Sequence, residues 1–276
     1  MALLLQAASR ESLADLSARL DVFVDQVGAA DLERLGDELF AVTELLAGQK
    51  ALRRQLSDPS VPGSARTGLA EQLLGSRIQR PTLEAVTAAV AARWSRSIDL
   101  VDGLELLARN ALLGSAEKTG RLDEVEDELF RFGRILDREP RLAGLLADTG
   151  APADGRTTLL DQVLGGKVAG VSATLLRQAV RLPRGRHLDD VAEELAELAA
   201  ARRQRSIARV TTPVALTDAQ EDRLRDSLSR LYGRPISVQV ELDEALLGGL
   251  VVRVGGDVID GSVAGRLEAA RRQLPR

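Results

Sequence analysis

The feature that most constrains the fold is an internal repeat with a period of ninety residues. The string DELF occurs at residues 37–40 and again at 127–130, and an ungapped shift of ninety residues aligns identical residues at 20 of 72 positions. Shared helical periodicity would match apolar residues, but it does not explain why Pro62 aligns with Pro152. The period therefore indicates that one structural unit has been duplicated.

Each copy has the pattern of a series of amphipathic helices. Residues 32–46 and 121–136 carry apolar side chains at intervals of three and four residues, which is typical of a helix with one buried face. Turn-forming residues follow each of these segments, and the next short helix in each copy ends at a glycine, Gly75 or Gly165, suited to a helix C-terminus.

Composition supports a helical fold for most of the chain. Phe, Trp and Tyr together make up 2% of the residues, and Leu, Ala and Val dominate the apolar content. Leu and Ala lose little conformational freedom in a helix. We therefore expect a mainly α protein with two helical bundles of five or six helices each, at residues 1–105 and 106–205.

From residue 206 to residue 276 the pattern changes to that of a small α+β domain. A β-branched segment is followed by a helix that begins at a capping box, Thr217 to Gln220, and ends at Gly233. Residues 236–242 alternate between apolar and polar, which predicts a strand. A hairpin and a final helix that begins near Ser262 complete this domain.

The glycines of this last domain raise the possibility of a nucleotide site. A dinucleotide-binding loop requires G-x-G-x-x-G directly between a strand and a helix. Here Gly255 and Gly256 are adjacent, and a second β segment precedes the helix. This spacing instead favours a β-hairpin with a glycine turn.

Other residues that could carry chemistry have simpler explanations. Lys167 follows two glycines but precedes a valine, so a phosphate loop lacks its magnesium-binding hydroxyl. His187 lies beside two aspartates without a nearby nucleophile, which favours a solvated loop residue. Asp243, Asp257 and Asp260 lie at expected strand ends, where Asp usually accepts backbone hydrogen bonds. Trp94, the one tryptophan, fits a partner anchor and a core residue equally well.

The overall composition excludes several classes of protein. The formal net charge of −4 argues against a general nucleic-acid binder. The absence of cysteine excludes disulfides and thiolate metal sites, and a single histidine excludes a His-rich metal site. The sequence has no run of about 18 apolar residues and no signal-peptide pattern at its start. We expect no catalytic, cofactor or metal site, and no direct insertion into a membrane.

The C-terminal domain resembles the F-type ATP synthase delta subunit family, which includes the oligomycin-sensitivity-conferring protein. The resemblance rests on a leucine-spaced helix, two small residues and the segment Gly-Gly-Asp-Val-Ile-Asp-Gly-Ser-Val-Ala-Gly-Arg-Leu at 255–267. The signature residues that we take as an interaction region are Gly248, Gly249, Gly255, Asp260, Ser262, Gly265 and Leu267.

The resemblance extends to residues 106–209, which are similar to the helical N-terminal domain of that family. Residues 1–105 exceed the usual family length, and the duplication accounts for this excess, as in the long delta subunits of actinobacteria. The resemblance leaves open which bundle makes the usual contact of the family.

The resemblance implies a non-catalytic subunit of the peripheral stalk. In the family, the helical domain binds N-terminal helices of the α subunits, and the C-terminal domain holds the C-terminal region of the b subunit. A location on the cytoplasmic face of the cell membrane, as a peripheral part of the complex, follows from this role. The alternative functions are a stand-alone helical-repeat scaffold and a nucleotide-dependent enzyme.

Overall fold

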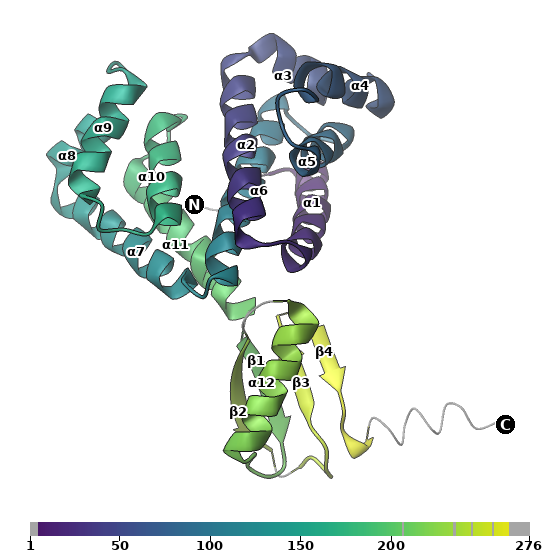
Figure 1. Ribbon diagram of the computed structural model, residues 1–276. Helices are drawn as coiled ribbons and strands as arrows, with labels where there is room; N and C mark the ends of the chain where they lie inside the picture. The colour runs from purple at the N-terminus through teal and green to yellow at the C-terminus, as the bar shows by residue number, and fades with distance from the viewer. Residues whose placement is uncertain (1–4, 206, 234–235, 244, 256, 265–276) are drawn as a thin grey trace. The chain divides into compact units, whose positions relative to one another are not determined.

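The computed structural model describes residues 5–205, 207–233, 236–243, 245–255 and 257–264. The chain divides into two compact units, Met1–Ala199 and Ala200–Arg276. Helices make up the first unit, and the second unit contains a small sheet with one helix (Figure 1). This confirms the predicted fold class, a mainly α chain followed by a small α+β domain.

The helical part contains two runs of helices that match each other at the ninety-residue offset. The helices are α1 (Ala7–Gln26), α2 (Ala29–Gly48), α3 (Lys50–Ser57), α4 (Gly63–Leu74), α5 (Arg80–Ala91), α6 (Ser97–Lys118), α7 (Leu122–Arg138), α8 (Pro140–Ala147), α9 (Ala153–Leu164), α10 (Gly170–Arg181) and α11 (Leu188–Arg205). A shift of ninety residues superimposes the bounds of α3, α4 and α5 on those of α8, α9 and α10. The repeat seen in the sequence is therefore a repeat of structure.

Helix α6 belongs to both runs. The same shift places α1 on α6 and α6 on α11, so α6 is the last helix of the first repeat and the first helix of the second repeat. The boundary expected between residues 105 and 106 falls inside this helix. We call α1–α6 the first repeat and α6–α11 the second repeat.

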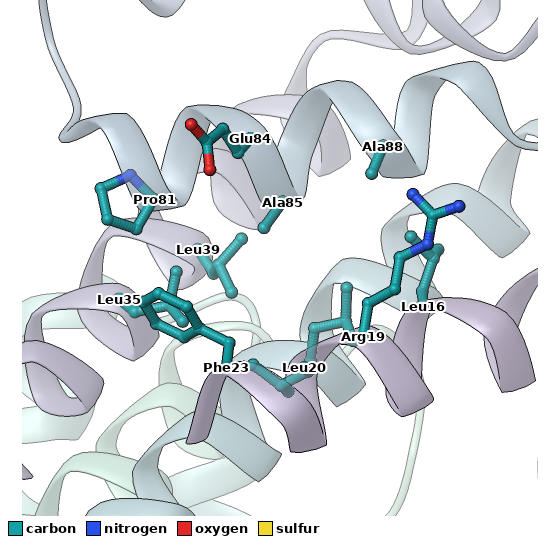
Figure 2. A pocket seen from close by; sticks show the side chains of 11 residues that line it. Leu16, Arg19, Leu20, Phe23, Leu35, Leu39, Pro81, Glu84, Ala85 and Ala88 are labelled. Carbon is teal, nitrogen blue, oxygen red and sulfur yellow. The ribbon is translucent and has the colours of Figure 1, made fainter. Parts of the chain in front are cut away.

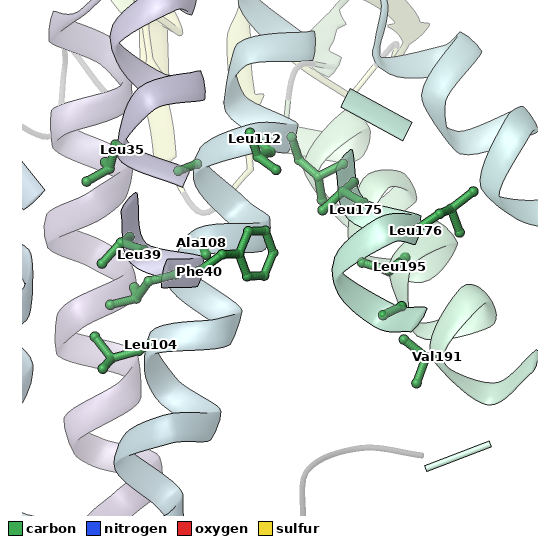
Figure 3. Close-up of a cluster of buried hydrophobic side chains, with 14 of the residues drawn as sticks. Leu35, Leu39, Phe40, Leu104, Ala108, Leu112, Leu175, Leu176, Val191 and Leu195 are labelled. Atoms are coloured by element: carbon green, nitrogen blue, oxygen red, sulfur yellow. The ribbon is translucent and has the colours of Figure 1, made fainter. Parts of the chain in front are cut away.

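One continuous hydrophobic core runs through both repeats and is centred on α6, most of whose residues are buried. Gly36 of α2 lies so close to α6 that a Cβ atom there would be 2.7 Å from the Leu112 side chain. Figure 3 shows part of this core, with side chains of α2, α6, α10 and α11 directed toward one another. Sharing α6 lets each repeat bury a face that it could not cover alone.

The two DELF strings each contain a glutamate, Glu38 or Glu128, that caps the N-terminus of a neighbouring helix. The capped helices, α5 and α10, are equivalent in the two repeats. The Glu38 carboxylate accepts hydrogen bonds from the backbone N of Gln79, at 3.0 Å, and from the Thr82 hydroxyl at the start of α5. Glu128 accepts equivalent bonds from Ala169 N, at 3.0 Å, and from the serine that replaces Thr82 in α10. Backbone N–H groups at a helix N-terminus need such acceptors, because they have no intrahelical partner.

The two glycines predicted to end short helices differ in conformation. Gly165, after α9, has a φ of 56° and is left-handed, as expected for a helix C-terminal glycine. Gly75, after α4, has a φ of −57° and stays right-handed, so the prediction of the same terminal geometry is wrong there. In the first repeat the chain continues in a tight turn, in which Arg77 N and Ile78 N donate to Leu74 O.

A buried ion network joins α6 to the loop between α10 and α11. The Glu105 carboxylate receives Arg109 Nη2 at 2.6 Å and Arg186 Nη2 at 2.5 Å, and it also pairs with Arg184. Arg184 Nη1 lies 2.6 Å from Asp102 Oδ1. Burial alone would raise the pKa of Glu105, but the three arginines together hold that pKa below its ordinary value.

In its described residues, the second unit is a four-stranded sheet covered by helix α12. Its elements are β1 (Ile207–Thr212), α12 (Asp218–Tyr232), β2 (Ser237–Leu242), β3 (Val251–Val254) and β4 (Asp257–Asp260), with the strand order β2-β1-β3-β4. β1 and β2 pair in parallel, because α12 carries the chain back across the sheet, and the β1–β3 and β3–β4 pairs are antiparallel. The strands predicted from the β-branched and alternating segments are confirmed.

Both ends of helix α12 are as predicted from the sequence, but one leucine of its predicted buried face is exposed. The capping box is present, with Thr217 N donating to Gln220 Oε1 at 2.9 Å, and Gly233 ends the helix with a φ of 64°. Leu224 and Leu228 pack on the sheet, whereas Leu231 is 66% exposed. The predicted apolar stripe therefore buries only its first two leucines, and in the last turn Tyr232, four residues after Leu228, packs against the core instead of Leu231.

Candidate interaction surfaces

The signature glycines shape the backbone of the second unit. Gly255 has a φ of 56° in the turn between β3 and β4, which confirms the predicted glycine hairpin. Gly248 and Gly249 also have positive φ values. A Cβ atom on Gly249 would lie 2.4 Å from Gly261 O, so only glycine fits where this turn meets the segment after β4.

Asp260 and Ser262 hold the segment after β4 that contacts the Gly249 turn. The Asp260 carboxylate accepts a hydrogen bond from Ser262 N at 2.9 Å, and its hydrogen bonds with Ser262 lower the pKa of Asp260. Val263 N donates to Gly248 O at 3.0 Å, which joins the two halves of the signature. The signature residues within the described chain therefore act on backbone geometry. The expected final helix begins at Val263, directly after Ser262, while its expected continuation, with Gly265 and Leu267, lies outside the described residues.

The remaining candidate residues serve structural roles where they are described. The loop after α9 is a helix terminus, with Lys167 N donating to Leu164 O, and His187 is exposed just before α11. Trp94 is buried, and its Nε1 donates to Ala89 O at 2.8 Å, so its role as an exposed anchor is wrong. Within the described residues, no group of three or more His, Asp or Glu side chains is arranged to hold a metal ion.

The first repeat carries an open apolar groove of about 250 Å³ between α1 and α5 (Figure 2). Its floor and walls are Leu16, Leu20, Phe23, Leu35, Leu39, Pro81, Ala85, Ala88 and Leu107. Arg19 and Glu84 also line the groove, one from each of the two helices. An amphipathic helix docks in such a groove by burying apolar side chains at helical spacing.

The corresponding position of the second repeat, between α6 and α10, is closed. The counterparts of Phe23 and Ala85 are Leu113 and Leu175, which are fully buried. The counterpart of Arg19 is Arg109, which lies in the ion network around Glu105. The groove residues could not be identified from the sequence, since both repeats have apolar residues at most of these positions.

The second unit exposes apolar side chains around the signature. Leu247 is 81% exposed, and Val258 and Ile259 of the edge strand β4 are also exposed. Val263 lies against Gly248, the neighbour of Leu247, and is itself partly exposed. Exposed apolar side chains make this part of the second unit a candidate protein-binding region, although Val258 and Ile259, as consecutive strand residues, point to opposite faces of the sheet. Among the described residues, no helix has both the length and the apolar content needed to cross a bilayer.

Comparisons with known proteins give a consistent result. The sequence model of the family described as ATP synthase delta (OSCP) subunit matches residues 109–274. ATP synthase subunit delta of Rhodococcus opacus (strain B4) is 46% identical over 272 residues, which cover 97% of this chain and 98% of that protein. The subunit delta of Streptomyces avermitilis is 46% identical over 267 residues, covering 97% of both chains.

A longer relative has the same identity over nearly the whole of this chain. ATP synthase subunit b-delta of Mycobacterium sp. (strain KMS) is 46% identical over 271 residues, or 98% of this chain. This chain spans only 61% of the length of that protein.

Proposed function

Because this chain belongs to the ATP synthase delta (OSCP) subunit family, we propose that it is a non-catalytic subunit of the peripheral stalk of the F-type ATP synthase. In this role it links the catalytic head to the membrane-anchored b subunit and supports the coupling of proton flow to ATP synthesis. The observation that carries the proposal is identity of about 46% along nearly the full length of delta subunits. The signature residues are consistent with a non-catalytic role, because those that are described set the conformation of backbone turns and do not form a reaction site.

The α1–α5 groove is the proposed contact with the catalytic head. An N-terminal helix of an α subunit would bury apolar side chains against Leu20 and Phe23, while Arg19 and Glu84 would pair with its charged residues. The open groove of the first repeat and the closed position of the second repeat support the first repeat as the site of this contact. This assigns the contact to the part of the chain that precedes the match to the family model.

The second unit is the proposed contact with the C-terminal region of the b subunit. The exposed side chains of Leu247, Val258 and Ile259 provide an apolar surface, and the signature glycines hold the turns that present it. Two separate binding surfaces on one chain raise the effective concentration of each contact once the other has formed. A chain that binds in this way transmits load at the cytoplasmic face of the membrane without inserting into it.

The proposal is tested by removing the protein from the complex and adding it back. Membranes depleted of it should leak protons and make little ATP under an imposed proton gradient, and the purified full chain should restore coupling. The purified chain should hydrolyse no ATP alone. Full coupling without the chain would refute the stalk function and favour the alternative of a stand-alone scaffold.

A further inference from the structure

Phe40 and Phe130 are equivalent residues of the two repeats, but their environments are opposite. Phe40 of α2 is 4% exposed, whereas Phe130 of α7 is 60% exposed. Figure 3 shows the ring of Phe40 extending from α2 toward the side of the core where Leu175 of α10 lies. The same face of the same helix is thus covered in the first repeat and uncovered in the second repeat.

The cover of the first repeat consists of the end of α10 and the loop that follows it. Arg181 Nε lies 3.0 Å from Glu44 Oε1 of α2, one turn after Phe40. Arg184, in the loop, pairs with Asp102 and Glu105 of α6. The end of α10 and its following loop therefore place two arginines against carboxylates of α2 and α6, beside the ring of Phe40.

The uncovered face of the second repeat also has carboxylates beside an aromatic ring. They lie at other positions, since the counterparts of Glu44, Asp102 and Glu105 are Arg134, Ala192 and Leu195. α7 and α11 approach closely, since a Cβ atom on Gly133 would lie 3.6 Å from Ala192 Cβ. Beside this contact is a hollow of about 150 Å³ that includes the exposed ring. The hollow is lined by Phe130, Gly133, Arg134, Asp137, Asp189, Asp190 and Glu193. Four carboxylates and one guanidinium give this surface a negative balance.

We propose that this α7–α11 face binds a helical segment of a partner protein that carries arginine or lysine beside an apolar residue. The apolar residue would pack on the Phe130 ring, and the basic residues would pair with Asp189, Asp190 and Glu193. The support is twofold: the charge of the face, and the covered counterpart in the same chain. The proposal does not depend on the α1–α5 groove, which lies on the other repeat.

A second copy of this chain is a poorer occupant. In a head-to-tail pair of chains, the first-repeat counterparts of Arg181 and Arg184 would meet the face, and these are Ala91 and Trp94. Trp94 is buried in its own core, and neither residue offers a positive charge. In the loop that follows Ala91, Arg96 already pairs with Asp99, so a second copy would offer only the exposed guanidinium of Arg93 in place of the two arginines.

Photocrosslinking in the assembled complex tests the proposal. The photoreactive amino acid p-benzoylphenylalanine replaces Phe130 in the full chain, and the crosslinked peptide is identified by mass spectrometry. We expect a product with a helical segment of another protein in which arginine or lysine neighbours the crosslinked residue. The same probe at Leu145, which is 59% exposed on α8, serves as the matched control and should not give this product.

Charge reversal supplies the second measurement. Because Asp190 and Glu193 are exposed, Asp190→Lys and Glu193→Lys should leave the circular dichroism of the chain unchanged. The melting temperature should fall only slightly, since Asp190 lies in the first turn of α11 and its carboxylate favours the helix N-terminus. The two changes together should lower the crosslink yield at residue 130 about tenfold. The proposal is overturned by the absence of a crosslink, by a crosslink to a second copy, or by a yield that charge reversal does not change.

Discussion

The guanidinium groups of Arg66 and Arg156, ninety residues apart, bind the C-terminal carbonyls of equivalent helices. Arg66 Nη1 donates to Val90 O at 2.6 Å and Nη2 to Ala91 O at 3.2 Å, at the end of α5. Arg156 Nη1 donates to Val180 O at the end of α10. Both side chains are buried, so each repeat depends on an arginine to satisfy carbonyls that a helix C-terminus leaves unpaired.

Replacing Arg156 with Met should lower the free energy of unfolding by about 1.5–3 kcal/mol, because buried carbonyls lose a charged hydrogen-bond donor. Arg66→Met should have an effect of the same size. Urea titration of the full chain measures both. Arg80→Met is the control, since Arg80 is exposed and its ion pair with Glu84 contributes less than about 1 kcal/mol. Equal losses for all three variants would contradict this role.

The sequence predicted the repeat and most helix ends because their causes are local. Apolar spacing sets the buried face of a helix, and residues such as Gly165, Gly233 and Thr217 set its ends. The shared helix was not predicted, because α1 and α6 have few identical residues in common. Residues such as Glu105 and Arg109 look solvated in the sequence, and their partners Arg184 and Arg186 lie about eighty residues away.

The binding surfaces were the least predictable part. Phe40 and Phe130 have the same local sequence, so only the position of α10 against α2 determines which ring is exposed. The described signature glycines were identified correctly as turn residues, but the sequence did not indicate that the side chains of Leu247 and Val258 beside them are exposed. Whether a side chain is exposed depends on which helices and strands pack against it, and this packing is determined by the whole fold.

Gly249→Ala should destabilise the second unit by about 1–3 kcal/mol. Gly249 has a φ of 81°, and an added Cβ would meet the backbone of Gly261 and Ser262, which cannot rotate away as a side chain does. Hydrogen exchange of the β3 and β4 amides measures the loss. Gly68→Ala is the matched control, because Gly68 lies in α4 with open space around it and should gain about 0.5–1 kcal/mol. Unchanged exchange in β3 and β4 would show that the turn tolerates a side chain.

Ala88→Arg should block the α1–α5 groove. The longer side chain fills a position on the groove wall without leaving a cavity, so the fold should survive while the affinity for an α-subunit N-terminal peptide falls about tenfold or more. Fluorescence anisotropy of the labelled peptide measures the affinity. Ala41→Arg, on the exposed side of α2, is the control, since the second repeat already has Arg131 at this position. Equal affinity for both variants would place the peptide elsewhere.

Leu247→Asp and Val258→Asp should weaken binding to the C-terminal region of the b subunit. Both side chains are largely exposed, so the variants should fold normally, and the loss of apolar contact should appear in the dissociation rate. Surface plasmon resonance with the immobilised b segment measures that rate. Leu145→Asp, at a leucine of α8 that is about as exposed as Val258, should dissociate at the rate of the unmodified chain. If only Leu145→Asp bound more weakly, the b subunit would contact the helical unit.

Glu105→Gln should lower stability by about 3–5 kcal/mol at pH 7, because three arginines would lose their shared carboxylate in a buried site. The pKa of Glu105 is lower in the folded protein than its ordinary value of 4.5. Its contribution is therefore fully present above that value and is lost as the pH falls through the folded-state pKa. The stability difference between wild type and variant should shrink on acidification.

The pKa of Asp102 is raised, whereas that of Glu105 is lowered, so the two carboxylates change the stability with pH in opposite directions. The pH dependence of Glu105 must therefore be measured by comparing wild type with a variant. Burial raises the pKa of Asp102 above its ordinary value, although Arg184 partly offsets this, so its ionisation opposes folding as the pH rises. Because wild type and Glu105→Gln both contain Asp102, the difference between their urea midpoints at pH 7 and at pH 3.5 cancels the effect of burial on Asp102 and leaves the charge of Glu105 together with its influence on Asp102. A difference that stays constant between these pH values would mean that the carboxylate of Glu105 contributes packing rather than charge.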